Sequence, residues 1–224
     1  MGENPEYVFN VGCPGMDLIK ETNLSCKAKF LKPQKGIGKK INFENDYIVV
    51  LMYPVTTEFR ETRDAAGELL KAIIKSKSFC DQVIWLWPNI DSGSEILSKA
   101  IRKARESDQL EHVHFYRNFP PEDYLVLINN CKCLVGNSSS GLRECGFLGI
   151  PVVNIGNRQS FREKSENVLS TKNNWLDIYE AIEKQFLNDR YPPSDLLGDG
   201  NAGKKMCDIL SHINLPNIQK KLHY

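Results

Sequence analysis

The chain has 224 residues, enough for one large domain or two small ones. Hydrophobic residues make up 41% and charged residues 25%, a balance that excludes disordered and fibrous classes. The net charge of +1 argues against a nucleic-acid or acidic-membrane partner, because no global field would recruit either. No apolar run approaches the roughly 18 residues of a membrane-spanning helix, and the first ten residues lack the apolar core of a signal peptide.

Seven cysteines are scattered along the chain. Their odd number and the lack of a C-x-x-C spacing argue against a disulfide framework and against a zinc site. Cys131 and Cys133 stand two apart on an expected strand, so we expect both thiols on one face and in the core. This cysteine usage is typical of a reducing compartment and predicts a cytoplasmic protein.

Short apolar runs alternate with longer helix-like stretches in chain order. The first run, YVFNV at 7–11, predicts a strand, whereas the basic, glycine-containing segment 25–47 predicts an irregular connector. Further strands are expected at 47–53, 83–88, 112–116, 133–136 and 151–155, with a short seventh at 167–170. Helices are expected at 57–77, 93–107, 121–130, 139–149, 173–188 and 201–212.

The alternation of strands and helices indicates the fold class. The strand at 47–53 is rich in Ile, Val and Leu without polar alternation, which is typical of a strand buried on both faces. The pattern therefore predicts an α/β protein with a single Rossmann-like, doubly wound parallel sheet and right-handed crossovers. Ligands of such a sheet bind at the carboxyl ends of its strands, where loops lead into helices.

Small polar residues follow five of the expected strands. The five loops read PVTTE, NIDSGSE, RNFPPEDY, NSSSG and GNRQSFRE. Turn formation and helix capping would explain any one of these loops alone. Capping does not require Asn137, Glu144 and Arg158 to converge, so the five loops together predict a ligand site at one edge of the sheet.

The loop NSSSG at 137–141 offers the donors that phosphate oxygens need. Unpaired amides at the start of the expected helix 139–149 carry a partial positive charge of about half a unit, and Ser138 and Ser139 add hydroxyl groups. Glu144 would lie about five residues into that helix, roughly 7–8 Å along its axis. A carboxylate there can accept both ribose hydroxyls, so the segment predicts a nucleoside diphosphate site.

Other nucleotide and hydrolase motifs are missing from the sequence. No G-x-G-x-x-G follows the first expected strand and no Walker A motif occurs, which weakens NAD and ATP interpretations. The serine loop is not a G-x-S-x-G elbow either. The four histidines have no spacing suited to a triad or a metal site, and we expect His112 and His114, which alternate on a strand, to be structural.

The chain carries the motifs YPVTTE, WPNIDSGS, VGNSSSGLRECGFLGIPVVNIGNRQ, RE…ENVL and GDGNA, between about residue 11 and residue 202. Together they resemble the hydrolysing UDP-N-acetylglucosamine 2-epimerases, above all the branch that begins the synthesis of sialic and related nonulosonic acids. The resemblance implies a GT-B-like protein of two Rossmann-like lobes with UDP held in the cleft between them.

The resemblance assigns residues 1–224 to the C-terminal lobe, and the family's N-terminal lobe would have to precede Tyr7. We therefore expect a fragment, a separately made lobe or a truncated product. The implied partners are a UDP-sugar and the missing N-terminal lobe. Because an isolated lobe should expose an apolar face, a homo-oligomer also stays open.

Several site residues are implied by position in the family motifs. Ser138 and Ser139 resemble the diphosphate ligands, and Glu144 resembles the ribose ligand. Asn89 and Arg158 resemble further polar contacts around the nucleotide. These assignments agree with the interpretation of the serine loop reached from its residues alone.

Three further positions complete the implied site. The backbone near Phe119 resembles the wall that reads the uracil edge, and Asp199 of GDGNA resembles a residue near the cleft. Tyr53 stands where the family typically has a histidine that serves the phosphate and leaving group. A tyrosine hydroxyl can donate one hydrogen bond, but with a pKa of about 10 it offers no cation at neutral pH.

The implied reaction converts UDP-N-acetylglucosamine and water to N-acetylmannosamine and UDP through a glycal intermediate, without a metal or redox cofactor. Most of the acid–base groups would come from the absent lobe, so this lobe alone is expected to be inactive. Two alternatives stay open. One is the C-terminal lobe of a UDP-sugar glycosyltransferase, and the other is a non-catalytic nucleotide-binding module, which Tyr53 favours.

Overall fold

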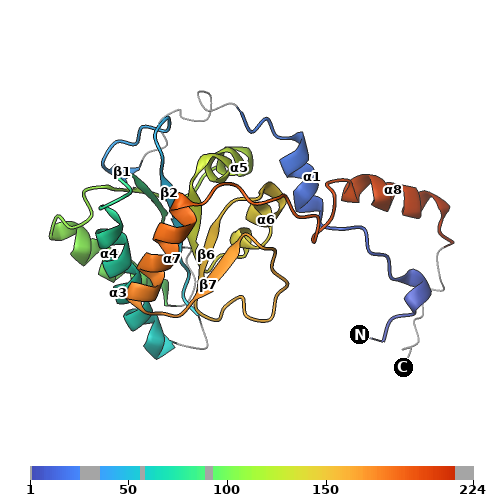
Figure 1. The fold of residues 1–224 in the computed structure, drawn as a ribbon. Helices are drawn as coiled ribbons and strands as arrows, with labels where there is room; N and C mark the ends of the chain where they lie inside the picture. The colour runs from blue at the N-terminus through green and yellow to red at the C-terminus, as the bar shows by residue number, and fades with distance from the viewer. Residues whose placement is uncertain (1, 26–35, 56–58, 89–92, 215–224) are drawn as a thin grey trace. The chain divides into compact units, whose positions relative to one another are not determined.

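A computed structural model describes residues 2–25, 36–55, 59–88 and 93–214, with side chains left undescribed at 59–63. The chain divides into two compact units. The larger unit, Asn23–Leu196, contains the entire β-sheet, and the smaller unit combines both ends of the chain, Met1–Thr22 and Leu197–Tyr224 (Figure 1).

The larger unit is built on a seven-stranded sheet with the order β1-β4-β3-β2-β5-β6-β7. Its strands are β1 (Ile37–Gly38), β2 (Ile48–Leu51), β3 (Val83–Leu86), β4 (Val113–Tyr116), β5 (Cys133–Gly136), β6 (Val152–Ile155) and β7 (Val168–Thr171). From β2 to β7 all pairs are parallel. Counted from β2, these strands follow the order 3-2-1-4-5-6 of doubly wound dinucleotide-binding folds. The predicted fold class is therefore confirmed.

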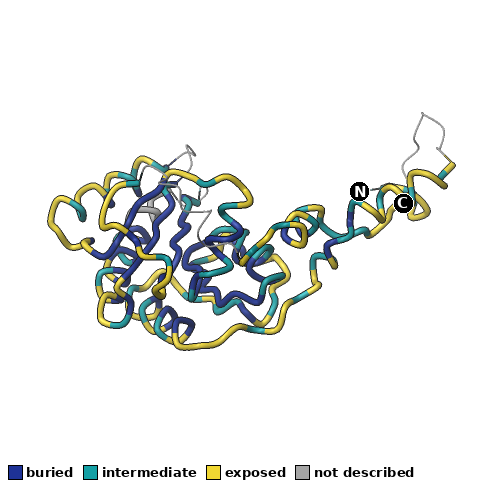
Figure 2. The backbone as a smooth tube through the Cα atoms, turned by 90° about the horizontal axis from the view of Figure 1, so that it is seen from above, coloured by how far each residue is buried: buried dark blue, intermediate teal, exposed yellow. Residues whose placement is uncertain are grey.

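Helices cover both faces of the sheet (Figure 1). On one face lie α3 (Phe59–Ser76), α4 (Ser94–Glu106) and α7 (Trp175–Leu187), and on the other lie α5 (Pro121–Asn130) and α6 (Glu144–Leu148). Val50, Trp85 and Val135 of the central strands are fully buried in the main core. Burial of such side chains stabilises the fold by roughly 1.5–3 kcal/mol each. The strands are buried, and many of the segments that connect them are exposed (Figure 2).

The edge strand β1 lies in the segment predicted to be an irregular connector. Ile37 and Gly38 pair antiparallel with Phe115 and His114 of β4, which adds an antiparallel edge to the parallel sheet. Gly38 has a φ of 122°, and a Cβ at this position would collide with the carbonyl oxygen of Val113. Glycine permits this close approach, and two residues are too few to give a strand pattern in the sequence.

The strand predicted at 7–11 is wrong. Residues Pro5–Tyr7 form the 3₁₀ turn η1, and residues 8–11 have no sheet partner in the described part of the chain. Val8 is 63% exposed and Phe9 is 46% exposed, so the apolar pattern reflects no buried strand. The next helix, α1 (Pro14–Glu21), was missed although Pro14 stands at its first position, where proline is favoured.

In the smaller unit α1 packs against α8 (Ala202–His212), which confirms the helix predicted at 201–212. Asp17 of α1 caps the N-terminus of α8. Its Oδ1 accepts a hydrogen bond from the amide of Ala202 at 2.9 Å, and its Oδ2 accepts one from Gly203 at 2.7 Å. A carboxylate also interacts favourably with the positive end of the helix dipole, by roughly 0.3–1 kcal/mol.

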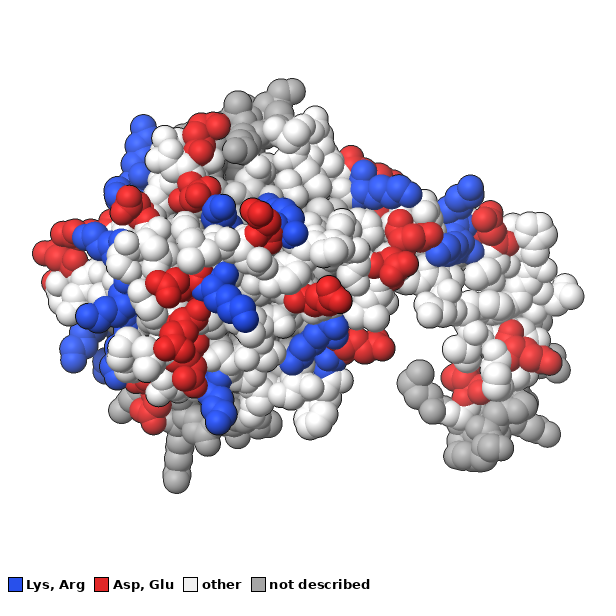
Figure 3. Space-filling model, viewed as in Figure 1, with Lys and Arg blue, Asp and Glu red and all other residues white. Residues whose placement is uncertain are grey.

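Charged residues of both signs are interspersed over the face shown in Figure 3. This mixture is in keeping with the net charge of +1. The ion pairs are surface pairs such as that of Lys77 and Glu111, whose charged atoms lie 2.9 Å apart.

Over the described ranges, no helix combines the length and apolar character that would let it cross a membrane.

Candidate functional site

The strands β2 and β5 pair at the centre of the sheet, where the strand order reverses. Ligands of doubly wound sheets bind outside the carboxyl ends of the strands at this point. Gly136 ends β5 opposite Leu51 of β2, and its φ is 139°. A Cβ on Gly136 would collide with the carbonyl oxygen of Leu51, so only glycine lets the chain leave the sheet here.

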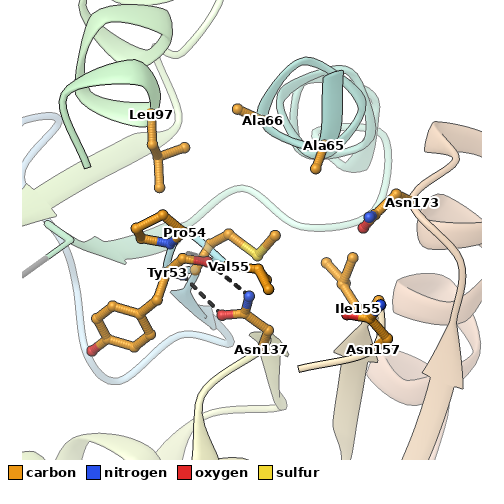
Figure 4. Close-up of a pocket in the computed structure, with 12 residues that line it drawn as sticks. Tyr53, Pro54, Val55, Ala65, Ala66, Leu97, Asn137, Ile155, Asn157 and Asn173 are labelled. Atoms are coloured by element: carbon orange, nitrogen blue, oxygen red, sulfur yellow. Dashed lines mark hydrogen bonds between the residues drawn. The ribbon is translucent and has the colours of Figure 1, made fainter. Parts of the chain in front are cut away.

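Asn137 follows Gly136 and connects the loops after β2 and β5 (Figure 4). Its side chain is buried, and its Oδ1 accepts a hydrogen bond from the amide of Tyr53 at 2.8 Å. Its Nδ2 donates to the carbonyl oxygen of Tyr53, also at 2.8 Å. The main chain of Tyr53 is therefore held by a pair of hydrogen bonds from a single buried amide.

The loop after β6 reaches the same place through Arg158 and Gln159. Both side chains donate to the carbonyl oxygen of Asn137, at 3.1 Å from Arg158 Nη1 and 2.9 Å from Gln159 Nε2. The guanidinium carbon of Arg158 lies 5.4 Å from the centre of the Tyr53 ring, within range of a cation–π interaction. The structure thus brings together Tyr53 and Arg158, which the sequence singled out separately.

The three serines of the loop after β5 have different partners. Ser138 Oγ accepts a hydrogen bond from the amide of Ser140 at 3.3 Å and caps η2 (Ser139–Gly141). The Ser140 hydroxyl lies 2.6 Å from the hydroxyl of Tyr124 on α5. In the described part of the chain, the backbone amides of Ser138 and Ser139 have no hydrogen-bond partner. They are the donors in this loop that remain open to an acceptor.

The prediction of one continuous helix at 139–149 is wrong. The turn η2 is followed by a separate five-residue helix, α6, and Arg143 between them has φ −91° and ψ −82°. Gly141, at the end of η2, packs closely on β6: a Cβ there would lie 2.8 Å from Val152 Cγ1. Glu144 starts α6, rather than standing about five residues inside a longer helix.

The side chain of Glu144 is 20% exposed, and its Oε1 lies 3.8 Å from Nε of Arg143, whose side chain is 40% exposed. Such a long, solvated pair holds its partners weakly, by about 0–1 kcal/mol. The carboxylate of Glu144 is therefore not locked into the protein interior and is open to hydroxyl donors.

The remaining predicted site residues are spread over the chain. Phe119 follows β4 and is half-buried, and its ring centre lies 4.9 Å from that of Tyr116. Asn89 lies outside the described residues. Asp199 belongs to the smaller unit, where its Oδ1 accepts from Lys205 Nζ at 3.0 Å and from the amide of Asn201 at 3.2 Å. The hydrogen bond from Lys205 lowers the pKa of Asp199 to about 2.

A pocket opens beside Tyr53 at the carboxyl edge (Figure 4). Its lining residues are Met52, Tyr53, Pro54, Val55, Ala65, Ala66, Leu97, Asn137, Ile155, Gly156, Asn157 and Asn173. Apolar walls with a few amide groups are typical of sites for small molecules. Asn157 lies in the polar loop GNRQSFRE, although it was not singled out there, and Asn173, which follows β7, was missed because the rule was not applied to the loop after that strand.

The buried thiols do not contribute chemistry to this site. Cys131 and Cys133 lie in the core, as predicted, but Cys131 follows α5 rather than lying on the strand. Burial raises the pKa of Cys131 to about 12 and that of Cys133 well above its usual value. A thiol that stays protonated is a poor nucleophile and metal ligand.

The described residues contain no group of three or more His, Cys, Asp or Glu side chains able to hold a metal ion.

Comparison with known proteins identifies the family. Residues 1–211 match the family model described as UDP-N-acetylglucosamine 2-epimerase. The chain belongs to this epimerase family. Its fold, its matched length and its resemblance from sequence motifs all agree with this assignment.

Three curated relatives show the extent of the likeness. The UDP-N-acetylglucosamine 2-epimerase of Neisseria meningitidis is 28% identical over 96% of this chain and 54% of its own length. The hydrolysing UDP-N,N'-diacetylbacillosamine 2-epimerase of Legionella pneumophila is 26% identical over the same shares. Polysialic acid biosynthesis protein P7 of Escherichia coli is 31% identical over 75% of this chain and 41% of its own length. The chain spans about half the length of the curated relatives it matches.

Solved structures agree on the fold. The UDP-GlcNAc 2-epimerase of Methanocaldococcus jannaschii, in complex with UDP-GlcNAc and UDP, has a TM-score of 0.70 and 14% identity over 94% of this chain and 56% of that chain. The Neisseria meningitidis enzyme bound to UDP-GlcNAc has a TM-score of 0.66 and 15% identity over 93% of this chain and 56% of that chain. This chain therefore has the fold of one lobe of a two-lobe, GT-B-like architecture.

Proposed function

We propose that this chain is the C-terminal, UDP-binding lobe of a hydrolysing UDP-N-acetylglucosamine 2-epimerase. Family membership supports a nucleotide-sugar substrate, and relatives named as hydrolysing epimerases support the reaction. The observation that carries the proposal is the pair of amides at Ser138 and Ser139, which have no partner among the described residues, in the loop that follows β5 at the switch point of the sheet. Glu144 begins α6 three residues beyond that loop.

In this proposal Ser138 and Ser139 bind the diphosphate. Their open amides are neutral donors, and the hydroxyl of Ser139 adds another. The diphosphate carries negative charge that amides alone balance poorly, so a cation is also needed. Arg158 is exposed on the loop after β6 and supplies a permanent positive charge at the same strand end.

Glu144 accepts the two ribose hydroxyls in this proposal. The carboxylate follows the serine loop directly and is partly exposed, which suits a group that must receive two donors from a ligand. The backbone near Phe119 reads the uracil edge, and Tyr116 supports the Phe119 ring from behind. By the family resemblance, Asn89 is assigned a further polar contact with the nucleotide, and Asp199 is assigned a place near the family's cleft.

Tyr53 serves the leaving group. When UDP departs from C1 of the sugar, negative charge develops on its terminal phosphate, and donors placed there lower the barrier. Tyr53 offers a hydroxyl in the place of the family histidine, and the cation that histidine could supply comes instead from Arg158 beside its ring. The acid and base that act at C2 belong to the N-terminal lobe in this proposal, so the chain alone does not turn over.

A non-catalytic nucleotide-binding module is the second candidate, because Tyr53 replaces the family histidine. One experiment separates the epimerase lobe from this module and from the lobe of a UDP-sugar glycosyltransferase. The N-terminal half of a family member is supplied in trans with UDP-N-acetylglucosamine, and the products are followed by NMR. Free N-acetylmannosamine and UDP support the epimerase, whereas transfer of the sugar to an acceptor supports a glycosyltransferase. Absence of turnover, even with Tyr53→His, supports the module.

The sugar and the setting of the reaction are part of the same proposal. A relative named for polysialic acid biosynthesis supports the sialic acid branch, and relatives named for diacetylbacillosamine support a diacetamido sugar equally well. The lobe works in the cytoplasm as part of a two-lobe enzyme. Whether copies of that enzyme associate is tested by light scattering of the two lobes together.

A further inference from the structure

Asn137 connects three loops through its backbone and its side chain. Its amide donates to Leu51 at the end of β2, at 3.1 Å. Its side-chain oxygen and nitrogen bond the amide and carbonyl of Tyr53, and its own carbonyl oxygen accepts from Arg158 and Gln159. The residue is only 1% exposed, so these bonds form in a setting where unpaired polar groups are costly.

These contacts close a circuit of three residues. The side chain of Asn137 fixes the main chain of Tyr53, and the ring of Tyr53 lies beside the guanidinium of Arg158. Arg158 in turn donates to the carbonyl oxygen of Asn137. A displacement of any one member therefore changes the surroundings of the other two.

We propose that Asn137 is a positioning residue that holds Tyr53 and Arg158 in the arrangement required by the diphosphate of a UDP-sugar. The inference rests on the proposed function of the site. Asn137 acts through its two neighbours, because its own side-chain atoms are used by the backbone of Tyr53. Loops that are ordered before the ligand arrives lose less conformational entropy on binding, and this raises affinity.

The chemistry of the bridge explains why the residue is an asparagine. Tyr53 presents one donor and one acceptor, and an amide of this length offers the complementary acceptor and donor. A carboxylate would place an oxygen against the carbonyl oxygen of Tyr53, and an aliphatic side chain would leave both backbone groups unpaired. Alanine is the cleaner test, because it removes the bridge without adding a negative charge near the diphosphate.

The neighbouring strand supplies a matched control. Asn154 of β6 pairs in register with Gly136, and it is also 1% exposed. Its side chain donates to Ser170 Oγ at 3.4 Å, and its Oδ1 is buried without a hydrogen-bond partner among the described residues. Asn154→Ala therefore makes the same chemical change as Asn137→Ala, at the same burial, one strand away from the circuit.

The test measures UDP affinity by calorimetry, the melting temperature, and amide hydrogen exchange by NMR in the 224-residue chain. Asn137→Ala should weaken UDP binding about tenfold or more, the effect of losing two buried hydrogen bonds that order the site. Asn154→Ala should weaken binding by less than about threefold. The Tyr53 amide should exchange at least about tenfold faster in Asn137→Ala alone.

A double variant tests the route of the effect. Asn137→Ala keeps the backbone carbonyl that accepts from Arg158, so its effect should pass through Tyr53. The fold-losses of Asn137→Ala and Tyr53→Ala should therefore not multiply, and the double variant should bind only slightly more weakly than Tyr53→Ala. Equal affinity losses in Asn137→Ala and Asn154→Ala, unchanged exchange at Tyr53, or fully multiplicative losses would overturn the positioning role. A wild-type chain that binds no UDP would instead refute the proposed function, and thereby identify which of the two ideas has failed.

Discussion

The hydroxyl of Tyr124 lies 2.6 Å from the hydroxyl oxygen of Ser140, and this contact ties the serine loop to α5. Burial raises the pKa of Tyr124 well above its ordinary value, so the phenol stays protonated across the physiological range. The third serine of the loop is thus used by the fold. Ser138 and Ser139 are left as the residues of the loop whose amides have no partner in the described part of the chain.

Tyr124→Phe should therefore affect both the fold and the site. Loss of the hydrogen bond to Ser140 should reduce the free energy of unfolding by about 1 kcal/mol, and UDP should bind several-fold more weakly because the loop is less fixed. Urea denaturation and calorimetry measure the two effects. Tyr179→Phe is the control, since that hydroxyl donates to Glu183 at 3.3 Å on α7. Equal affinity losses in both variants would contradict a role for Tyr124 in the site.

Glu144→Gln should reduce the preference of the site for ribose. A carboxylate that accepts two hydroxyls favours UDP over 2'-deoxy-UDP by about tenfold, the scale of a charged hydrogen bond. The variant should lose most of that preference while it retains affinity for 2'-deoxy-UDP. Glu163→Gln, a change at an exposed residue of the β6–β7 loop, should bind like the wild type. If Glu144→Gln keeps the preference for UDP over 2'-deoxy-UDP, Glu144 does not bind the ribose hydroxyls.

His112 should make stability depend on pH below neutrality. Burial lowers the pKa of its imidazole, whose Nε2 lies 2.9 Å from the carbonyl oxygen of Ile73. The unfolded chain then binds a proton near pH 6.5, before the folded chain does, so stability should fall as pH decreases below about 6.5. His112→Gln should flatten this slope in urea denaturation between pH 7 and pH 5. An unchanged slope would mean that the pKa of His112 is not lowered in the folded state.

The cysteines should differ sharply in reactivity. Burial raises the pKa of Cys80 to about 11 and of Cys131 to about 12, whereas Cys207 on α8 is exposed. A thiol reagent at pH 8 should therefore modify Cys207 rapidly in the native chain and spare Cys80 and Cys131 until denaturant is added. Mass spectrometry of the labelled peptides gives the order. Rapid labelling of Cys131 under native conditions would indicate that the core opens readily.

Much of the fold follows from local sequence features. The strands β2, β3, β5 and β6 were predicted because each is a short apolar run, and burial on both faces of a parallel sheet selects such runs. The edge that carries the candidate site followed from the polar loops after these strands. Both predictions rest on residues that are close in sequence. The structure confirms the strands, and the ligand site at this edge stays a prediction.

The features that were missed depend on contacts between distant residues. The break between η2 and α6 lies where Gly141 packs closely on Val152 of β6. The edge strand β1 needs the backbone of β4 beside Gly38, and residues 8–11 have a strand-like pattern but no neighbouring strand. The pair of hydrogen bonds between Asn137 and Tyr53 joins residues 84 positions apart, and no spacing in the sequence predicts it.

The most direct test of the account removes one amide at the mouth of the serine loop. Ser139 is the first residue of η2, and Ser138 before it has φ −70° and ψ 142°, an extended conformation that a following proline favours. In calorimetric titration, Ser139→Pro should bind UDP at least about tenfold more weakly than Ser139→Ala, because Ser139→Ala loses only the hydroxyl and keeps the amide. Equal UDP affinity in both variants, with unchanged melting temperatures, would contradict a diphosphate bound at these amides.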